Sequence, residues 1–165
     1  MTAVRRPPQV AVVGPGDVTD EKLLADAETV GAGLARAGAV VVTGGLGGVM
    51  AAAARGAKSA GGQVVGMLPG VDADAANEWV DVAVPTGLGQ GRNLLVVRSA
   101  RVVVAVGGSW GTLAEIALAR RLDIPVVSLH GWTVVGPAAG DGVVEVTSAA
   151  EAVKAAAAWL SSSPG

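Results

Sequence analysis

The chain alternates between short, continuously apolar runs and longer segments in which apolar residues recur at helical spacing. The apolar runs are rich in valine and are bounded by glycine, proline or a charged residue, at 10–13, 40–42, 64–68, 102–106 and 126–129. Runs without polar alternation are typical of strands covered on both faces, as in parallel sheets. The pattern therefore predicts five buried strands. Segment 79–84 predicts a shorter strand near an edge, and 143–146 predicts one more.

Helical periodicity fills the intervals between these runs. In the first interval, four apolar residues recur at i, i+4, i+7 and i+11 between an acidic start and a glycine, namely Leu23, Ala27, Val30 and Leu34. Further helices are predicted at 50–60, 93–99, 113–122 and 149–160. The repeated order of strand and helix predicts an α/β fold, a Rossmann-like doubly wound, mostly parallel sheet flanked by helices.

Length and composition narrow this expectation. A chain of 165 residues is long enough for one domain with a sizeable core, so we expect a single domain over 1–165 with tails at 1–8 and 161–165. Hydrophobic residues make up 51% of the chain but aromatic residues only 2%. The core must therefore be built from valine, alanine, leucine and close glycine contacts.

Charge and residue usage argue against several classes of partner. A formal net charge of −2 gives no field that would recruit nucleic acid. The chain has no cysteine and one histidine, which argues against a metal site built on thiolates or imidazoles. Prolines and glycines break the N-terminal apolar stretch well short of a signal peptide or membrane span. We expect a cytoplasmic protein without a membrane, nucleic-acid or metal partner.

Three of the predicted strands end in glycine-rich turns, "GPGD" at 14–17, "TGGLGGVM" at 43–50 and "GGSWGT" at 107–112. Glycine lets backbone amides approach an anion, and the following helix presents its positive end to a phosphate. One such turn is more often only a turn. Three on one sheet edge favour a phosphate-ligand site, whose candidate residues are Gly14, Pro15, Gly16, Gly44, Gly45, Gly47, Gly48, Gly107, Gly108, Ser109, Trp110, Gly111 and Thr112.

Four polar or aromatic residues near these turns have two interpretations each. Thr112 and Glu115 have the spacing of a capping box, which explains both without a ligand, although a glutamate there could also face a bound sugar. Trp110 could stack on a purine or pterin, or cover the start of the helix. His130 follows a predicted strand and could line the site, but a loop histidine is the more common case.

The segments "GGSWGTLAE", "GRN" and "TGGLGGVM" resemble motifs of the Lonely Guy (LOG)-like proteins, formerly labelled lysine decarboxylase-like. The resemblance spans about residues 10–129 and is greatest to the branch that includes molybdenum cofactor carrier proteins. The family signature is Pro-Gly-Gly-x-Gly-Thr-x-x-Glu, preceded by an Arg-Lys pair. Gly111, Thr112 and Glu115 match it, and Arg92 falls on the family arginine. Departures are Gly107 for the proline, Ser109 for the second glycine and Asn93 for the lysine.

The resemblance implies two functions. In the hydrolytic LOG enzymes it implies cleavage of nucleoside 5′-monophosphates to base and ribose 5-phosphate, with Arg92 and Glu115 as catalytic residues at the ribose. The departures favour the carrier-like branch, in which the implied role is to bind a molybdenum cofactor or an AMP-like nucleotide. Arg92, Asn93 and Glu115 then join the ligand-binding residues. A third reading is a ligand-sensing or purely structural oligomer.

The predicted helix at 93–99 bears on assembly, because it is apolar on most sides. We expect that face to be buried against the sheet or a second subunit. A homo-oligomer, dimer or tetramer, is therefore expected, and the resemblance implies the same. No cofactor is expected to be required for folding.

Overall fold

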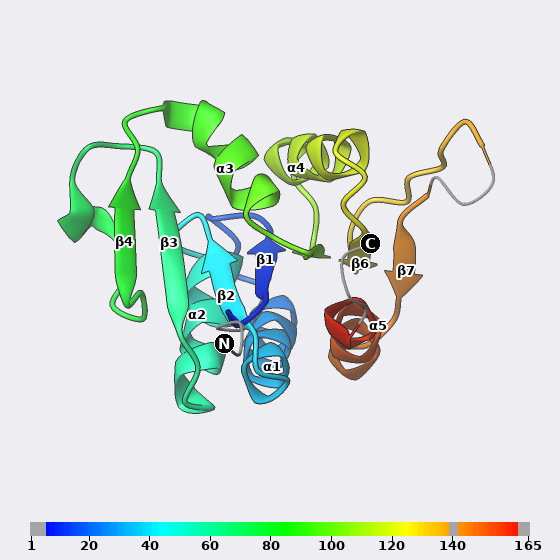
Figure 1. Ribbon diagram of the computed structural model, residues 1–165, viewed down its shortest axis with the longest axis horizontal. Helices are drawn as coiled ribbons and strands as arrows, with labels where there is room; N and C mark the ends of the chain where they lie inside the picture. Colours follow the sequence, from blue (N-terminus) through cyan, green and yellow to red (C-terminus); the bar gives the residue numbers. More distant parts are fainter. Residues whose placement is uncertain (1–5, 139–141, 162–165) are drawn as a thin grey trace, which may run out of the picture.

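The computed structural model describes residues 6–138 and 142–161, which form a seven-stranded sheet covered by helices on both faces (Figure 1). Every strand pairs parallel to its neighbours, in the order β4-β3-β2-β1-β5-β6-β7. The strands are β1 Gln9–Val13, β2 Val40–Thr43, β3 Val64–Leu68, β4 Val82–Pro85, β5 Val102–Val106, β6 Val126–Leu129 and β7 Val144–Val146. The predicted α/β fold is confirmed.

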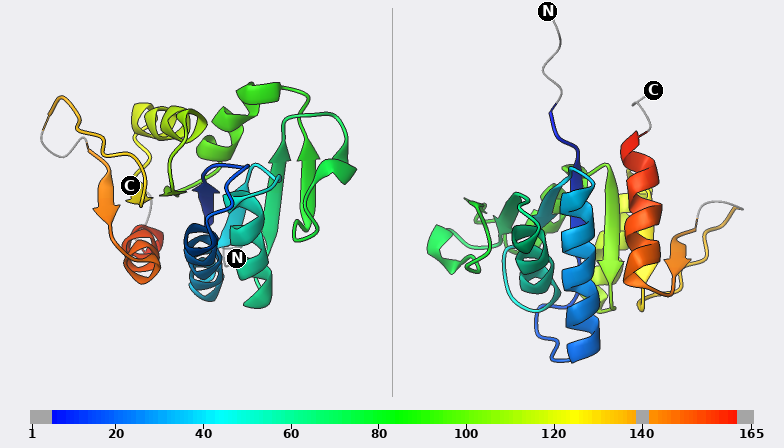
Figure 2. Two further views of the ribbon diagram at one scale, coloured as in Figure 1. Left: turned by 180° about the vertical axis from the view of Figure 1, so that it is seen from behind. Right: turned by 90° about the horizontal axis from the view of Figure 1, so that it is seen from below.

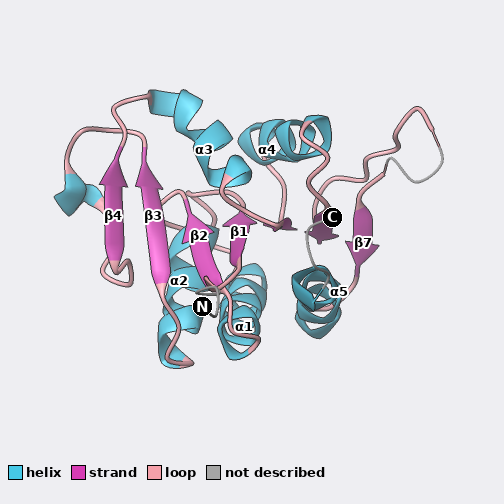
Figure 3. Ribbon diagram, viewed as in Figure 1, coloured by secondary structure: helices cyan, strands magenta, loops and turns pink. Residues whose placement is uncertain are grey.

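Five α-helices lie against this sheet, α1 Glu21–Arg36, α2 Val49–Ser59, α3 Arg92–Arg98, α4 Trp110–Arg121 and α5 Ala149–Ser161. Short 3₁₀ turns occur at Ala73–Ala75 and Gly89–Gly91. Helices α1, α2 and α5 cover one face, whereas α3 and α4 cover the other (Figures 2 and 3). No helix in the described ranges combines the length and apolarity needed to cross a membrane.

The strand order reverses its direction of growth between β1 and β5. Strands β2, β3 and β4 are added on one side of β1, and β5, β6 and β7 on the other. In open parallel sheets, ligands bind at the carboxyl ends of the strands beside such a reversal. The carboxyl ends of β1, β2 and β5 carry the three glycine-rich turns, so the topology brings these turns to one edge.

The face covered by α1 and α2 is held by close backbone contact between the two helices. A Cβ atom added at Gly31 would lie 2.0 Å from the Ala53 carbonyl oxygen, and one added at Gly56 would lie 1.9 Å from the Glu28 carbonyl oxygen. Only glycine permits this approach. The main core cluster here consists of valine, alanine and leucine, as the composition predicts.

Two predicted segments differ from the structure. The strand expected at 79–84 begins only at Val82, as β4 (Val82–Pro85). It begins late because the preceding residues form a turn, in which the Trp79 amide donates to the Asn77 side chain. The last turn residue, Asp81, instead accepts a hydrogen bond from the Val64 amide at 2.8 Å. The helix expected at 113–122 begins at Trp110. Of the expected tails, residues 1–5 and 162–165 lie outside the described residues.

Candidate functional site

A cavity of about 230 Å³ lies at the carboxyl edge, bounded by the ends of β1 and β2, the start of α3 and the first turns of α4. The predicted site residues that line it are Gly14, Pro15, Gly16, Gly44, Arg92, Asn93, Ser109, Gly111, Thr112 and Glu115. Four segments that are far apart in the chain therefore meet around one space.

The other predicted residues, Gly45, Gly47, Gly48, Gly107, Gly108 and Trp110, do not line this cavity. Three of these shape the turns, because Gly45, Gly48 and Gly107 have φ angles of 77°, 59° and 72°. These values lie in the region that favours glycine. At Gly48 a side chain is also excluded by space, because a Cβ would lie 2.4 Å from the Pro15 carbonyl oxygen.

Six lining residues were not predicted, namely Val12, Val13, Asp17, Leu46, Met50 and Gln90. Five of them are within or adjacent to predicted strands and turns, so a wider window around each glycine turn would have included them. Gln90 precedes α3 and is reached through Asn93, whose amide donates to the Gln90 side chain at 3.4 Å. No sequence signal marks that contact.

Two of the lining glycines are explained by packing. A Cβ at Gly14 would lie 2.3 Å from the Val106 carbonyl oxygen, where the end of β1 passes the end of β5. A Cβ at Gly44 would lie 2.7 Å from the Arg92 guanidinium. Gly44 therefore makes room for an arginine, which links the second glycine turn to α3.

Arg92 is the central cation of the site. It begins α3 and is only 8% exposed. Its guanidinium donates to the Asn93 side-chain oxygen and, at 3.4 Å, to the Gly44 carbonyl, whereas its Nε has no hydrogen-bond partner. Within the described ranges, the ion pairs at 4.0 Å or less do not include Arg92. Burial lowers its pKa and the charge of Glu115 opposes this effect, but arginine remains charged in proteins.

The start of α4 corrects the predicted capping box. Ser109 is the N-cap, because its hydroxyl accepts the Thr112 amide at 3.2 Å and lies 3.0 Å from the Thr112 hydroxyl. Thr112 is therefore the third residue of the helix and does not cap it. The capping-box interpretation of Thr112 and Glu115 is wrong, since the helix begins earlier than its apolar periodicity indicates.

Glu115 is consequently a cavity-lining residue within the helix, with no role at the helix start. It is 7% exposed and lies across the cavity from the buried guanidinium of Arg92. Burial raises the pKa of Glu115 from its ordinary value of 4.5 to about 7, and the positive charge of Arg92 partly opposes this rise. A carboxyl group with such a pKa can hold or release a proton near neutral pH.

Trp110 and His130 lie beside the cavity. Trp110 is 77% exposed, and its ring centroid lies 4.9 Å from that of Trp132. The Trp132 indole in turn donates to the Ser109 carbonyl at 2.9 Å. His130 follows β6 with a φ of 54°, and its Nε2 lies 3.2 Å from Asp26. Trp110 is next in the chain to the lining residues Ser109 and Gly111, but neither Trp110 nor His130 lines the cavity.

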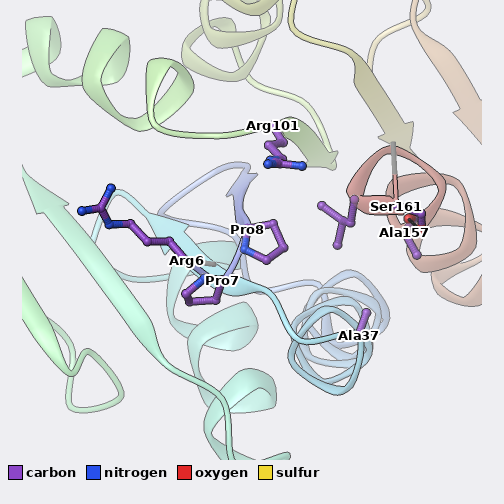
Figure 4. Close-up of a pocket in the computed structure, with 8 residues that line it drawn as sticks. Arg6, Pro7, Pro8, Ala37, Arg101, Ala157 and Ser161 are labelled. Carbon is purple, nitrogen blue, oxygen red and sulfur yellow. Dashed lines mark hydrogen bonds between the residues drawn. The ribbon is translucent and has the colours of Figure 1, made fainter. Parts of the chain in front are cut away.

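A larger cavity of about 590 Å³ lies at the opposite, amino edge of the sheet (Figure 4). It is surrounded by Arg6, Pro7, Pro8, Ala37, Arg101, Ala157, Leu160 and Ser161. Its three polar side chains, those of Arg6, Arg101 and Ser161, are all exposed. The carboxyl-edge cavity is smaller, but it alone of the two has buried charged and polar side chains in its wall, and it is therefore the candidate site.

The chain is similar to known proteins over most of its length. The model of the SLOG cluster4 family matches residues 7–158. An uncharacterised protein of Archaeoglobus fulgidus is 43% identical over 121 residues, which are 73% of this chain and 79% of that protein.

Solved structures extend the similarity over the whole fold. The molybdenum cofactor carrier protein of Chlamydomonas reinhardtii is 37% identical with a TM-score of 0.84, over 95% of this chain and 100% of that one. The molybdenum cofactor binding protein of Rippkaea orientalis is 34% identical with a TM-score of 0.83, over 91% of this chain and 95% of that one. The resemblance to LOG-like proteins noted from the sequence is thereby confirmed.

Proposed function

The chain belongs to the SLOG cluster4 family, and from that premise we propose that it binds a phosphate-bearing ligand at the carboxyl edge and acts as a carrier. The ligand is a molybdopterin-type cofactor or a nucleotide. This proposal is supported by similarity to the solved structures of a molybdenum cofactor binding protein and a molybdenum cofactor carrier protein. It is also supported by the chemistry of the cavity, as follows.

The observation that carries the proposal is that Arg92 is buried and, among the described residues, has no carboxylate within ion-pair distance. A buried guanidinium without a close carboxylate is costly, because its desolvation is only partly offset by hydrogen bonds to neutral oxygens. A phosphate would supply the missing negative charge, and arginine binds phosphate oxygens with matched geometry. We therefore assign Arg92 to the ligand phosphate.

The first turn of α4 adds donors to the same space. Ser109, Gly111 and Thr112 line the cavity beside Arg92, and α4 is a twelve-residue helix whose N-terminal end points to this edge. The first amides of a helix and its dipole stabilise anions. Apart from its chain neighbours and the backbone of its own helix, no atom of the described residues lies closer than 3.7 Å to the place of a Cβ at Gly111, so a ligand can approach the helix there.

Binding of ribose 5-phosphate, measured by calorimetry and thermal shift, tests this proposal. The wild type should bind the sugar phosphate and unfold at a higher temperature in its presence, because the ligand binds the folded state. Arg92→Gln should abolish binding, whereas Arg98→Gln, in the exposed last turn of the same helix, should not affect it. Equal binding by both variants would contradict the role of Arg92. Retention of molybdopterin by the wild type but not by Arg92→Gln would identify the cargo.

Glu115 favours a second candidate function, that of a phosphoribohydrolase acting on nucleoside 5′-monophosphates. A carboxylate near neutral pKa beside the ribose could stabilise positive charge on the sugar and orient water. Release of free base from AMP by the wild type, lost in Glu115→Gln, would support hydrolysis and overturn the carrier assignment. Binding without release would support the carrier.

A homo-oligomer and a cytoplasmic location belong to the same proposal. On α3, Leu94 and Leu95 are 44% and 38% exposed, which leaves an apolar strip of the kind that a second subunit covers. Light scattering on the wild type and on Leu94→Glu/Leu95→Glu measures this directly. A monomeric wild type would contradict the oligomer.

A further inference from the structure

A second cavity of about 300 Å³ adjoins the Arg92 cavity at Pro15, which lines both. It lies between the start of α1 and the loops that follow β5 and β6. Its lining includes Pro15, Leu23, Asp26, Gly107, Gly108 and His130. Gly107 and Gly108, from the glycine-rich turn at 107–112, do not line the Arg92 cavity but do line this second one.

The Arg92 cavity is too small to hold a whole nucleotide or pterin ligand. Cavities that hold small ligands commonly measure roughly 300–1,000 Å³. The Arg92 cavity, at about 230 Å³, is below this range and accommodates a phosphate with part of a sugar or side chain. The remainder of a larger ligand must extend out of it. The second cavity offers comparable space directly beyond Pro15.

The second cavity has an apolar part in its lining, formed around Gly107, as well as charged residues that include Asp20 and Lys22. A Cβ at Gly107 would lie 2.7 Å from the Leu23 side chain and 3.4 Å from Cδ of Pro15. The Gly107 backbone therefore lies directly against these two side chains. Together these groups form a contiguous apolar part of the lining, against which an apolar ring can pack.

The wall of the second cavity holds a carboxylate with spare acceptor capacity. Oδ2 of Asp26 interacts with Lys22 Nζ at 2.8 Å and with His130 Nε2 at 3.2 Å. In the described parts of the chain, Oδ1 of Asp26 has no hydrogen-bond partner. The side chain is 21% exposed and lines the cavity. Ionised carboxylates only accept hydrogen bonds, so Asp26 selects a ligand edge that donates.

His130 makes this wall unusual. Its φ of 54° is a conformation that residues other than glycine rarely adopt, and it is one of two such residues in the described ranges. This conformation accompanies the approach of the imidazole to Asp26. Uncommon backbone conformations at a cavity wall point to function there.

We propose that the second cavity binds a flat heterocycle with a 2-amino-4-oxopyrimidine edge, as found in both guanine and pterin. The ring packs on Pro15, Leu23 and Gly107, while Oδ1 of Asp26, whose two lone pairs are not used by Lys22 or His130, accepts hydrogen bonds from the adjacent ring N–H and exocyclic amino group. This inference rests on the proposed function, because the phosphate of the same ligand occupies the Arg92 cavity.

Calorimetric titration with ribose 5-phosphate, GMP, AMP and 6-hydroxymethylpterin phosphate tests the proposal. Asp26→Asn keeps the shape of the side chain but replaces an acceptor with a donor. It should weaken binding of GMP or the pterin phosphate at least about tenfold, the loss expected for hydrogen bonds to a charged group. Ribose 5-phosphate should bind equally well. Glu28→Gln is the matched control, because it removes another ion-paired carboxylate of α1 outside the cavity.

Val18→Trp provides an independent variant, because Val18 lines the second cavity but not the Arg92 cavity, and a larger side chain would fill the second one. It should weaken GMP or pterin phosphate binding and preserve ribose 5-phosphate binding. Tighter binding of the pterin phosphate than of GMP identifies the ring as a pterin, and the reverse identifies it as guanine.

AMP lacks the ring N–H donor and should bind more weakly than the preferred ligand in the wild type, with the difference lost in Asp26→Asn. Binding of ribose 5-phosphate without any effect of Asp26→Asn or Val18→Trp would overturn this inference alone. Failure of ribose 5-phosphate to bind the wild type would overturn the proposed function itself.

Discussion

The helices on the two faces of the sheet place different chemistry against it. On the α1–α2 face, Gly31 and Gly56 bring two helix backbones into direct contact, and the buried core cluster beneath consists of valine, alanine and leucine. On the α3–α4 face, the buried residues include Arg92, Asn93, Thr112 and Glu115. The first face therefore contributes stability, whereas the second places polar groups where burial costs free energy.

Glycine has different roles on the two faces. On the α1–α2 face it permits close packing of two helices, whereas on the α3–α4 face it leaves space in the candidate site. At Gly56 an added Cβ would meet backbone that cannot move without separating two helices. At Gly111 the corresponding space is open, and at Gly44 it is filled by the side chains of Met50 and Arg92. The number of glycines in a segment does not distinguish these roles. They are distinguished by the atoms that surround the place where a Cβ would lie.

The largest effect is expected on the α1–α2 face. Gly56→Ala should lower the free energy of unfolding by about 3 kcal/mol, because the new Cβ would force α1 and α2 apart and this exceeds the gain in helix propensity. Gly70→Ala, where no atom lies within 4 Å, is the control. Urea denaturation measures both. A loss below 1 kcal/mol would show that the two helices can separate cheaply.

The next effect concerns pH and the α3–α4 face. Because burial raises the pKa of Glu115 from 4.5 to about 7, the folded state holds a proton that the unfolded state releases. The free energy of unfolding should therefore fall by roughly 3 kcal/mol as pH rises through the interval between these two values. Denaturation at a series of pH values should show this slope in the wild type. A slope unchanged in Glu115→Gln would assign it to other groups.

A smaller effect, of opposite sign, should follow from making the second face apolar like the first. Arg92→Met/Glu115→Leu should raise the free energy of unfolding by about 1 to 2 kcal/mol, because burying two charges costs more than their mutual attraction returns. Binding of ribose 5-phosphate should be lost in the same variant. Destabilisation at pH 7 would show that these residues support the fold as well as the site.

The smallest effect is expected at the start of α4. Ser109→Ala should cost about 1 kcal/mol, since it removes the cap of the Thr112 amide. Thr29→Ala, within α1, removes a hydroxyl that donates only to the Ala25 carbonyl and serves as the control. Thermal unfolding measures the two variants. Equal stabilities would indicate that a different group caps α4.

The five buried strands and the order of strand and helix were predictable because continuous apolar runs must be covered on both faces. The bounds of strands at the edge of the sheet were less predictable, as Asp81 shows. Its carboxylate binds the Val64 amide and Lys58, and the pairing of β4 with β3 begins only at the next residue. The start of α4 was misplaced because apolar periodicity begins at Leu113, whereas Ser109 provides the cap. A helix begins where its first amides find acceptors, which can precede its apolar face by a turn.

The sequence by itself determined the fold class and the sheet edge at which three glycine turns meet, because both follow from local patterns and from the shared direction of parallel strands. Only the tertiary structure decided that Arg92 faces Glu115 across one cavity and that Asp26 and His130 wall a second one beside it. These pairs come from different helices and loops. Their burial and pKa depend on the packing between those elements, which no local pattern encodes.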